Sequence, residues 1–319
     1  MNPKQFLETI YRLCLGREPD PAGYQHWLKV LESTGDYASV LNSFLESTEY
    51  AARQRAAPPV ESQRKPRNPA GLLRDLRRPL RIVDVGAQML VPQSHVYESL
   101  LEFPAEIIGF DPLEERLRER AEAEGGPALK LYPYAIGDGG AHTLYVNNDD
   151  GTSSLFPLNS RLNSKFNHLH ELKTVETREI VTRRLDDALP GGPIDFLKLD
   201  VQGAELMILQ SAPRSLANTA VVHCEAEFSP IYQDQPLFPA IYDLLTWHGF
   251  DFIDLLASGR YHYLTKSGET SHDRLIWGDT IFFRETQDRQ TLLVQSVIAD
   301  VVYGKASLAE YLYEKAEAA

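Results

Sequence analysis

The chain has 319 residues, 43% of them hydrophobic, so it can form one large globular domain with a sizeable core and one small domain. Its 45 acidic residues outnumber the 32 basic ones and give a net charge of −13, which argues against nucleic acid or an anionic membrane surface as the main partner and favours a small-molecule or glycan substrate. Two cysteines, Cys14 and Cys224, are too few for a disulfide framework or a cysteine metal site and favour a reducing, cytoplasmic location.

The N-terminal segment predicts a small helical bundle over residues 1–52. Lys, Glu and Arg interrupt its apolar residues, so it lacks the core of a signal peptide, and no stretch approaches the roughly 18 apolar residues of a membrane helix. We therefore expect a protein that does not span a membrane. Apolar periodicity predicts a helix over 3–15 that stops at Gly16, a second from Pro19–Pro21 through Leu31, and a third over 36–45.

Residues 53–79 read as a linker. The sequence RQRAAPPVESQRKPRNP contains four prolines and almost no apolar residues. Its arginines could contact an acidic partner or a phosphate, but the composition favours a solvated connection between two domains.

From Arg81 the pattern alternates between strands and helices, which predicts a mainly parallel sheet covered on both faces over 80–288. The expected strands are Ile82–Val85, Glu106–Phe110, Leu129–Ala135, Phe196–Leu199, Val221–Cys224, Phe252–Leu256 and Thr280–Phe283, and the clearest helices are Glu114–Glu124, Ala204–Gln210 and Phe238–His248. His142–Val146 and Ser154–Phe156 flank NNDDG and are expected to pair as a hairpin. Residues 289–319 predict a helical tail for packing or dimerisation.

Carboxylates close most of the expected strands, and strand ends are where ligands bind in doubly wound sheets. The ends read Asp84-Val-Gly86, Gly109-Phe-Asp111, Ala135-Ile-Gly-Asp138, Lys198-Leu-Asp200 and Glu225-Ala-Glu227. An acidic residue after the second strand suits both hydroxyls of a ribose, which is the role we expect for Asp111. Gly86 would let the backbone approach the ligand, and Asp138 would bind an adenine amino group or cap a turn.

The segments VDVGA, IGFDP, AIGD, DFLKLDVQGAEL and HCEAEFSPIYQDQPLF, in this order, resemble the FkbM family of S-adenosylmethionine-dependent methyltransferases over about 80–285. DFLKLDVQGAEL is the most specific of them. The resemblance implies an α/β fold with the seven-stranded, Rossmann-like class I methyltransferase sheet, the cofactor S-adenosylmethionine, and methyl transfer to an oxygen, commonly a sugar or polyketide hydroxyl.

The resemblance also assigns roles by position. It places the first cofactor motif at Asp84, Gly86, Ala87 and Gln88, the ribose contact at Asp111, and the adenine end near Asp138. The block near donor and acceptor comprises Lys198, Asp200, Gln202, Gly203 and Glu205. Gln202 stands where many members carry Glu, which keeps a hydrogen bond but removes one candidate base.

Methyl transfer from a sulfonium is an in-line displacement, so the site must align donor and acceptor and provide a base for the hydroxyl proton. The candidate bases are Asp200, Glu225, Glu227 and His223. Asp200 and Glu227 are preferred because both follow apolar strands, and Lys198 is expected beside them in the catalytic block. Substrate contacts are expected from Gln202, Glu205, Glu225 and Tyr232. Asp200 with Glu225 or Glu227 could instead hold a divalent cation, but no compact ligand spacing supports it, and we predict no metal.

Other polar and aromatic residues are expected around the acceptor. The segment 149–174, rich in Asn, Ser and His, is a candidate acceptor lid, with His168 and His170 on its surface. Tyr232, Gln233 and Trp277 could bind a sugar ring, although Trp277 fits core packing equally well.

The N-terminal FLETIYRLCLGREPDPAGYQHWLKVLES and FLESTEY resemble a bacterial domain of unknown function with the pattern L-G-R-x-P-D-x-x-G-x-x-x-W over about 1–52. Members of that family occur in surface-associated and glycan-modifying proteins, which favours a saccharide acceptor. Arg17 paired with Asp20, and Trp27 in the bundle core, would explain the pattern structurally. The bundle could also bind a protein partner or a second copy of the chain.

Two functions remain open from the sequence. The first is an S-adenosylmethionine-dependent O-methyltransferase acting on a bacterial sugar, glycan or glycolipid precursor. The second is an impaired methyltransferase-like scaffold acting through its helical bundle. They differ on the loop IVDVGAQMLVP, where Gln88, Met89 and Leu90 replace the family's Asn-x-Gly and the next helix is expected only near Ser94. A dinucleotide-dependent oxidoreductase is disfavoured because G-x-G-x-x-G is missing after the first strand.

Overall fold

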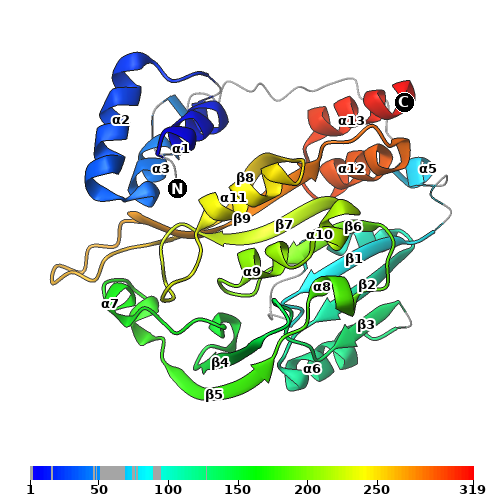
Figure 1. Cartoon of the computed structure of the whole chain (residues 1–319), viewed down its shortest axis with the longest axis horizontal. Helices are drawn as coiled ribbons and strands as arrows, with labels where there is room; N and C mark the ends of the chain where they lie inside the picture. Colours follow the sequence, from blue (N-terminus) through cyan, green and yellow to red (C-terminus); the bar gives the residue numbers. More distant parts are fainter. Residues whose placement is uncertain are drawn as a thin grey trace.

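The computed structural model describes residues 3–15, 17–45, 47, 49–50, 69–73, 76, 78–88, 95–126 and 128–319. Its strands are β1 (Leu80–Val85), β2 (Ala105–Phe110), β3 (Leu129–Tyr132), β4 (Ala141–Asn147), β5 (Thr174–Val181), β6 (Ile194–Leu199), β7 (Thr219–Glu227), β8 (Phe250–Tyr261) and β9 (Arg274–Arg284). Seven of them form one sheet in the order β3-β2-β1-β6-β7-β9-β8, and β4 and β5 form a separate two-stranded sheet (Figure 1).

The large sheet is parallel except at one end. β3, β2, β1, β6 and β7 run in the same direction, whereas β9 is antiparallel to both β7 and β8. This is the seven-stranded α/β sheet that the sequence predicts. Chain order reverses between β1 and β6, and such a switch point leaves a crevice at the carboxyl ends of the strands.

Helices cover both faces of this sheet (Figure 1). Alternation along the strands sends Val83 and Val85 into one hydrophobic cluster and Leu80 and Ile82 into another. The first cluster includes residues of α8 (Leu185–Ala188), α9 (Glu205–Gln210), α10 (Pro213–Ala217) and α11 (Phe238–Trp247). The second includes residues of α5 (Pro69–Leu73), α12 (Arg289–Val301) and α13 (Ala306–Ala318).

Two more helices and several short turns complete the domain. α6 (Glu114–Glu124) packs beside β3, and α7 (Ser160–Asn163) lies in the segment between β4 and β5. Short 3-10 turns are found at Glu98–Glu102, Asp150–Thr152 and Leu169–Glu171. Within the described parts of the chain, every helix is too short or too polar to cross a lipid bilayer.

The N-terminal bundle consists of α1 (Pro3–Ile10), a π-helical segment (Tyr11–Leu15), α2 (Pro21–Thr34) and α3 (Tyr37–Leu45). Asp20 caps α2 by accepting a hydrogen bond from the Gly23 amide at 2.8 Å, and it also pairs with Arg17, as the sequence pattern predicts. The bundle packs on the sheet domain, where Arg274 of β9 reaches Asp36 at 3.0 Å. The expected stop at Gly16 lies outside the described residues.

Two expectations about local structure need correction. β4 pairs along its length with β5, which the sequence reading missed, and Ser154 forms only a single bridge with Tyr145 of β4. The expected linker also ends earlier than predicted, because Leu72, Leu73 and Leu76 pack against the cluster around α12. Residues 53–68, 74, 75 and 77 of that expected linker lie outside the described ranges.

Candidate active site

A cavity of about 230 Å³ lies at the carboxyl ends of β1, β2, β6 and β7. The loop after β4, including Asp150, Gly151, Ser153 and Ser154, closes one side of it. Of the thirteen residues predicted for the site, six line the cavity: Gly86, Gln88, Asp111, Lys198, Asp200 and Gln202. The other seven, Asp84, Ala87, Asp138, Glu205, Glu225, Glu227 and Tyr232, lie beneath or beside it.

Asp111 stands at the end of β2 and is 5% exposed. Its Oδ1 accepts a hydrogen bond from the Leu113 amide at 2.8 Å, and Oδ2 has no hydrogen-bond partner among the described residues. Burial raises the pKa of Asp111 to about 7, since only part of the lost hydration is replaced. A ligand that donates hydrogen bonds to Oδ2 would therefore stabilise the ionised carboxylate. Tyr134, Ala135 and Ile136 continue the cavity beyond Asp111 as a largely apolar slot.

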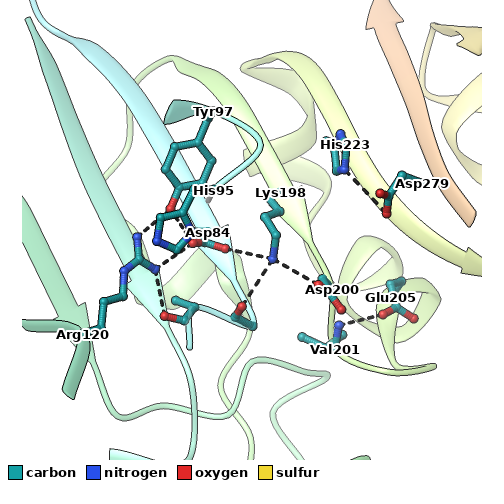
Figure 2. Close-up of polar contacts among 12 residues, drawn as sticks. Asp84, His95, Tyr97, Arg120, Lys198, Asp200, Val201, Glu205, His223 and Asp279 are labelled. Atoms are coloured by element: carbon teal, nitrogen blue, oxygen red, sulfur yellow. Dashed lines mark hydrogen bonds and ion pairs between the residues drawn. The ribbon is translucent and has the colours of Figure 1, made fainter. Parts of the chain in front are cut away.

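Asp84, on β1, is fully buried at the centre of an ionic network (Figure 2). Its carboxylate accepts hydrogen bonds from Tyr97 at 2.6 Å and Arg120 at 2.8 Å, and it lies 3.3 Å from the Lys198 ammonium. Burial opposes its ionisation, but the charges of Lys198 and Arg120 outweigh burial and lower the pKa of Asp84. Asp84 thus positions Tyr97, Arg120 and Lys198. It does not line the cavity, although the family resemblance placed it in the first cofactor motif.

The first loop is held in place by backbone contacts. Gly86 adopts a φ of +82°, and a Cβ there would lie 1.8 Å from the Asp200 carbonyl oxygen, so only glycine fits. The Lys198 Nζ donates to the Gly86 carbonyl at 3.3 Å, and Arg120 donates to that of Ala87 at 2.8 Å. Gln88 faces the cavity, whereas Ala87 is fully buried. Met89, Leu90 and the expected helix start at Ser94 lie outside the described residues.

Lys198 and Asp200 form an ion pair at the end of β6, 3.4 Å apart. Burial disfavours the lysine charge, but Asp84 and Asp200 more than offset burial and raise the pKa of Lys198. Burial also disfavours the charge of Asp200, yet Lys198 and hydrogen bonds lower its pKa. Lys198 is therefore a permanent cation and no proton acceptor, and Asp200 is an ionised carboxylate that is 29% exposed.

Gln202 links the carboxylates after β6 and β7. Its amide nitrogen donates to Glu225 at 2.6 Å and to Asp200 at 3.1 Å, while its oxygen accepts from the Tyr232 hydroxyl at 3.0 Å. Burial, and then the charge of Asp200, raises the pKa of Glu225, so Glu225 carries the proton of this carboxyl pair. The φ of Gln202 is +57°, a left-handed backbone conformation that is uncommon for residues other than glycine.

Four residues that were predicted to contact the cofactor or the substrate, or to act in catalysis, are engaged elsewhere in the structure. Tyr232 is fully buried and donates to the Thr152 carbonyl and Gln202, so it cannot stack on a sugar. Glu205 is buried and accepts from the Val201 and Gly203 amides, which fixes the loop after β6. Its burial raises its pKa to about 7.

Glu227 and Asp138 are the other two predicted site residues that lie outside the cavity lining. Glu227 is 1% exposed, and burial followed by the charge of Glu205 raises its pKa well above the ordinary range, so it is a neutral acid outside the cavity lining. Asp138 binds the Gly140 amide and His142 within its own turn, which is the capping alternative.

The expected acceptor lid is anchored at two points. Arg116 of α6 donates to Asp150 at 2.9 Å, and the Ser154 hydroxyl donates to the Gln202 carbonyl at 2.6 Å. His168 and His170 of the same segment are exposed, as expected. Gln233 bonds the Leu158 carbonyl, and Trp277 packs in a side cluster, so neither lines the cavity.

Sequence reasoning undervalued one part of the cavity. His223 of β7 and Asp279 of β9 line it together, with Nε2 of His223 3.7 Å from Oδ1 of Asp279 (Figure 2). The sequence named His223 among the candidate bases but preferred Asp200 and Glu227. Asp279 could not be predicted from the sequence, because it lies 56 residues from His223 and is brought beside it only by the antiparallel pairing of β7 with β9. Among the described residues, no group of three or more His, Cys, Asp or Glu side chains could hold a metal ion.

Comparison with known proteins identifies the families that two parts of the chain match. Residues 86–252, just over half the chain, match the methyltransferase FkbM domain, and residues 1–54 match a domain of unknown function, DUF4214. The 2-O-methyltransferase NoeI of Sinorhizobium fredii (strain NBRC 101917 / NGR234) is 30% identical over 150 residues, which cover 44% of this chain and 61% of that protein.

Solved structures resemble the chain more distantly. Methyltransferase FkbM from Methylobacillus flagellatus KT is 17% identical, with 87% of this chain and 57% of that chain covered and a TM-score of 0.39. The 1,6-didemethyltoxoflavin-N1-methyltransferase of Burkholderia thailandensis, with S-adenosylhomocysteine bound, is 14% identical, covers 79% and 90% of the two chains, and gives a TM-score of 0.29. These likenesses are too distant to bear on the activity.

Proposed function

Because the chain belongs to the FkbM methyltransferase family, we propose that it is an S-adenosylmethionine-dependent O-methyltransferase that methylates a hydroxyl of a sugar, glycan or glycolipid precursor. The 30% identity to a 2-O-methyltransferase supports oxygen as the acceptor atom. The chain spans 61% of that relative, so the nature of the acceptor is part of the proposal. The surplus of acidic residues supports an uncharged polyol over a phosphorylated or carboxylated acceptor.

The observation that carries the proposal is the free oxygen of Asp111 at the end of β2. A carboxylate that is almost wholly buried, lines a cavity and has one oxygen without a partner among the described residues fits the two hydroxyls of a ribose. The slot at Tyr134–Ile136 would take the adenine, and Gly86 and Gln88 would face the methionine end. S-adenosylmethionine bound there supplies an activated methyl group on a sulfonium centre.

The residues at the end of β6 suit a cationic donor. Ionised Asp200 favours a positive charge in the cavity, while the Lys198 ammonium is paired with Asp84 and Asp200 and donates to the Gly86 carbonyl. The lid residues anchored by Arg116 and by the Gln202 carbonyl would exclude water from the same space once ligands are bound. Together these groups would hold and orient donor and acceptor, which is the main demand of this transfer.

Calorimetry with S-adenosylmethionine and S-adenosylhomocysteine tests the proposal. We expect binding of both, lost with Asp111→Ala and retained with Asp138→Ala, the same change of an aspartate outside the cavity lining. No binding at about millimolar ligand would refute the proposal, because a dedicated cofactor site binds far more tightly than that. Release of S-adenosylhomocysteine with a panel of methyl hexopyranosides measures transfer itself; binding without release on any acceptor would favour the scaffold function.

A further inference from the structure

Two histidines, His95 and His223, line the cavity, and an imidazole is intrinsically a stronger base than a carboxylate. Nε2 of His95 is paired with Glu124 at 2.6 Å, whereas Nε2 of His223 lies 3.7 Å from Asp279. His223 lies on β7 beside Lys198 in register, is 4% exposed, and lines the cavity together with Asp279. Tyr303, which follows α12, lies parallel to the His223 ring at an interplanar angle of 3°. Phe196 of β6 stacks on the same ring. His223 is therefore fixed in orientation.

The two ring nitrogens have different surroundings. Nδ1 lies 3.3 Å from the Tyr303 hydroxyl, within hydrogen-bond distance. Nε2 lies 3.7 Å from Asp279 Oδ1, too far for a direct hydrogen bond but close enough for charge attraction. Because the partner of one nitrogen decides where a neutral imidazole carries its proton, Nδ1–H can donate to the Tyr303 oxygen and leave the Nε2 lone pair on the side of Asp279, which also lines the cavity.

We propose that His223 Nε2 is the base that takes the proton of the acceptor hydroxyl, with Tyr303 fixing the tautomer and Asp279 stabilising the imidazolium that results. This inference rests on the proposed function. The acceptor oxygen forms its bond to the methyl carbon, the carbon–sulfur bond breaks with its electron pair left on sulfur, and the hydroxyl proton moves to Nε2. Product release returns that proton to water.

The other candidate bases are less suited. Asp200 is held as an ion by Lys198 and receives a hydrogen bond from Gln202, and Glu225 already carries a proton. An imidazole is intrinsically more basic than an aspartate carboxylate. Lys198 of β6 lies beside His223 in register, Asp279 of β9 lies near Nε2, and the Tyr303 hydroxyl lies near Nδ1.

Nitrogen-15 NMR of histidine-labelled protein in complex with S-adenosylhomocysteine tests the tautomer and needs no acceptor. The His223 signals are assigned by their loss in His223→Asn. We expect the neutral ring to carry its proton on Nδ1, with Nε2 unprotonated. Tyr303→Phe should shift the balance toward Nε2–H, because Asp279 then becomes the better partner. A wild-type ring protonated at Nε2 would overturn the proposal.

Turnover gives the second test. His223→Asn keeps a donor to Tyr303 but removes Nε2, so we expect a loss of about 100-fold or more in kcat, the usual range for general-base catalysis. The affinity for S-adenosylhomocysteine should stay within about twofold, since the proposed cofactor contacts are Asp111, Gly86 and Gln88 and not His223. His26→Asn, on an exposed histidine of α2, is the matched control. Unchanged turnover with intact binding would overturn the role of His223 alone, whereas absent binding would overturn the proposed function.

Discussion

The pKa of Asp111 makes cofactor affinity depend on pH in a calculable way. Burial raises this pKa from its ordinary 3.8 to about 7, and ribose hydroxyls are expected to bind the ionised form. Only about a tenth of the protein is then competent at a pH of about 6, so the apparent Kd for S-adenosylhomocysteine should be about tenfold weaker than at a pH of about 8. That factor corresponds to about 1.4 kcal/mol.

Calorimetry at both pH values, in two buffers of different ionisation enthalpy, measures affinity and proton release together. Binding should release about 0.9 proton at a pH of about 6 and about 0.1 at a pH of about 8. Asp111→Asn should bind about 10- to 100-fold more weakly at the higher pH and show no such pH dependence, because an amide neither ionises nor makes charge-assisted bonds. Asp138→Asn should keep the dependence. A wild-type Kd that is flat across this range would refute the reasoning.

Replacing Asp111 by Asn should also change the stability of the protein. This change is a gain, whereas the change in cofactor affinity is a loss. The folded-state pKa of Asp111 lies above the unfolded value, so the wild-type protein loses stability as pH rises toward 7 and the buried carboxyl ionises. Asp111→Asn should therefore raise the free energy of unfolding of the free protein by at most about 4 kcal/mol at a pH of about 8 and about half of that at a pH of about 5.5. Urea denaturation at the two values measures this gain.

Three other substitutions test the remaining assignments. Asp84→Asn should cost about 3–5 kcal/mol in urea denaturation, because it leaves two buried cations without their shared anion; a loss below about 1 kcal/mol would contradict this. Gln202→Glu places a third carboxylate between Asp200 and Glu225, so the melting temperature should fall more at a pH of about 8 than at about 5, and equal shifts would argue against charge repulsion. Glu227→Gln should keep methyl transfer within about twofold, since this neutral acid lies outside the cavity lining; a loss of about 100-fold would restore it as a catalytic residue.

Several elements of the fold follow from local pattern alone. Short apolar runs followed by acidic or glycine residues predict β1, β2, β6 and β7 to within a few residues, because a buried parallel strand needs an unbroken apolar segment. The same pattern did not predict β5. Its sequence TVETREIV is mostly exposed, and it is stabilised by pairing with β4 and not by burial.

The strand ends also gave part of the site. Asp111 and Asp200 were predicted because a carboxylate that ends a parallel strand lies at the edge where ligands bind. Asp84 satisfies the same rule and yet points at Arg120, which lies 36 residues away on α6. A strand-end carboxylate can thus be a ligand contact or the centre of a buried network, and the distinction depends on which side chains pack over it.

By itself, the sequence determined the sheet, the family, and the row of carboxylates at its edge, because these depend on hydrophobic runs and on motifs of consecutive residues. Only the tertiary structure decided which of those carboxylates reach the cavity, which are neutralised by burial, and that Asp279 and Tyr303 stand beside His223. The physical reason is that ionisation and access depend on solvent exclusion and neighbouring charge, and both are set by residues that are brought together from distant parts of the chain.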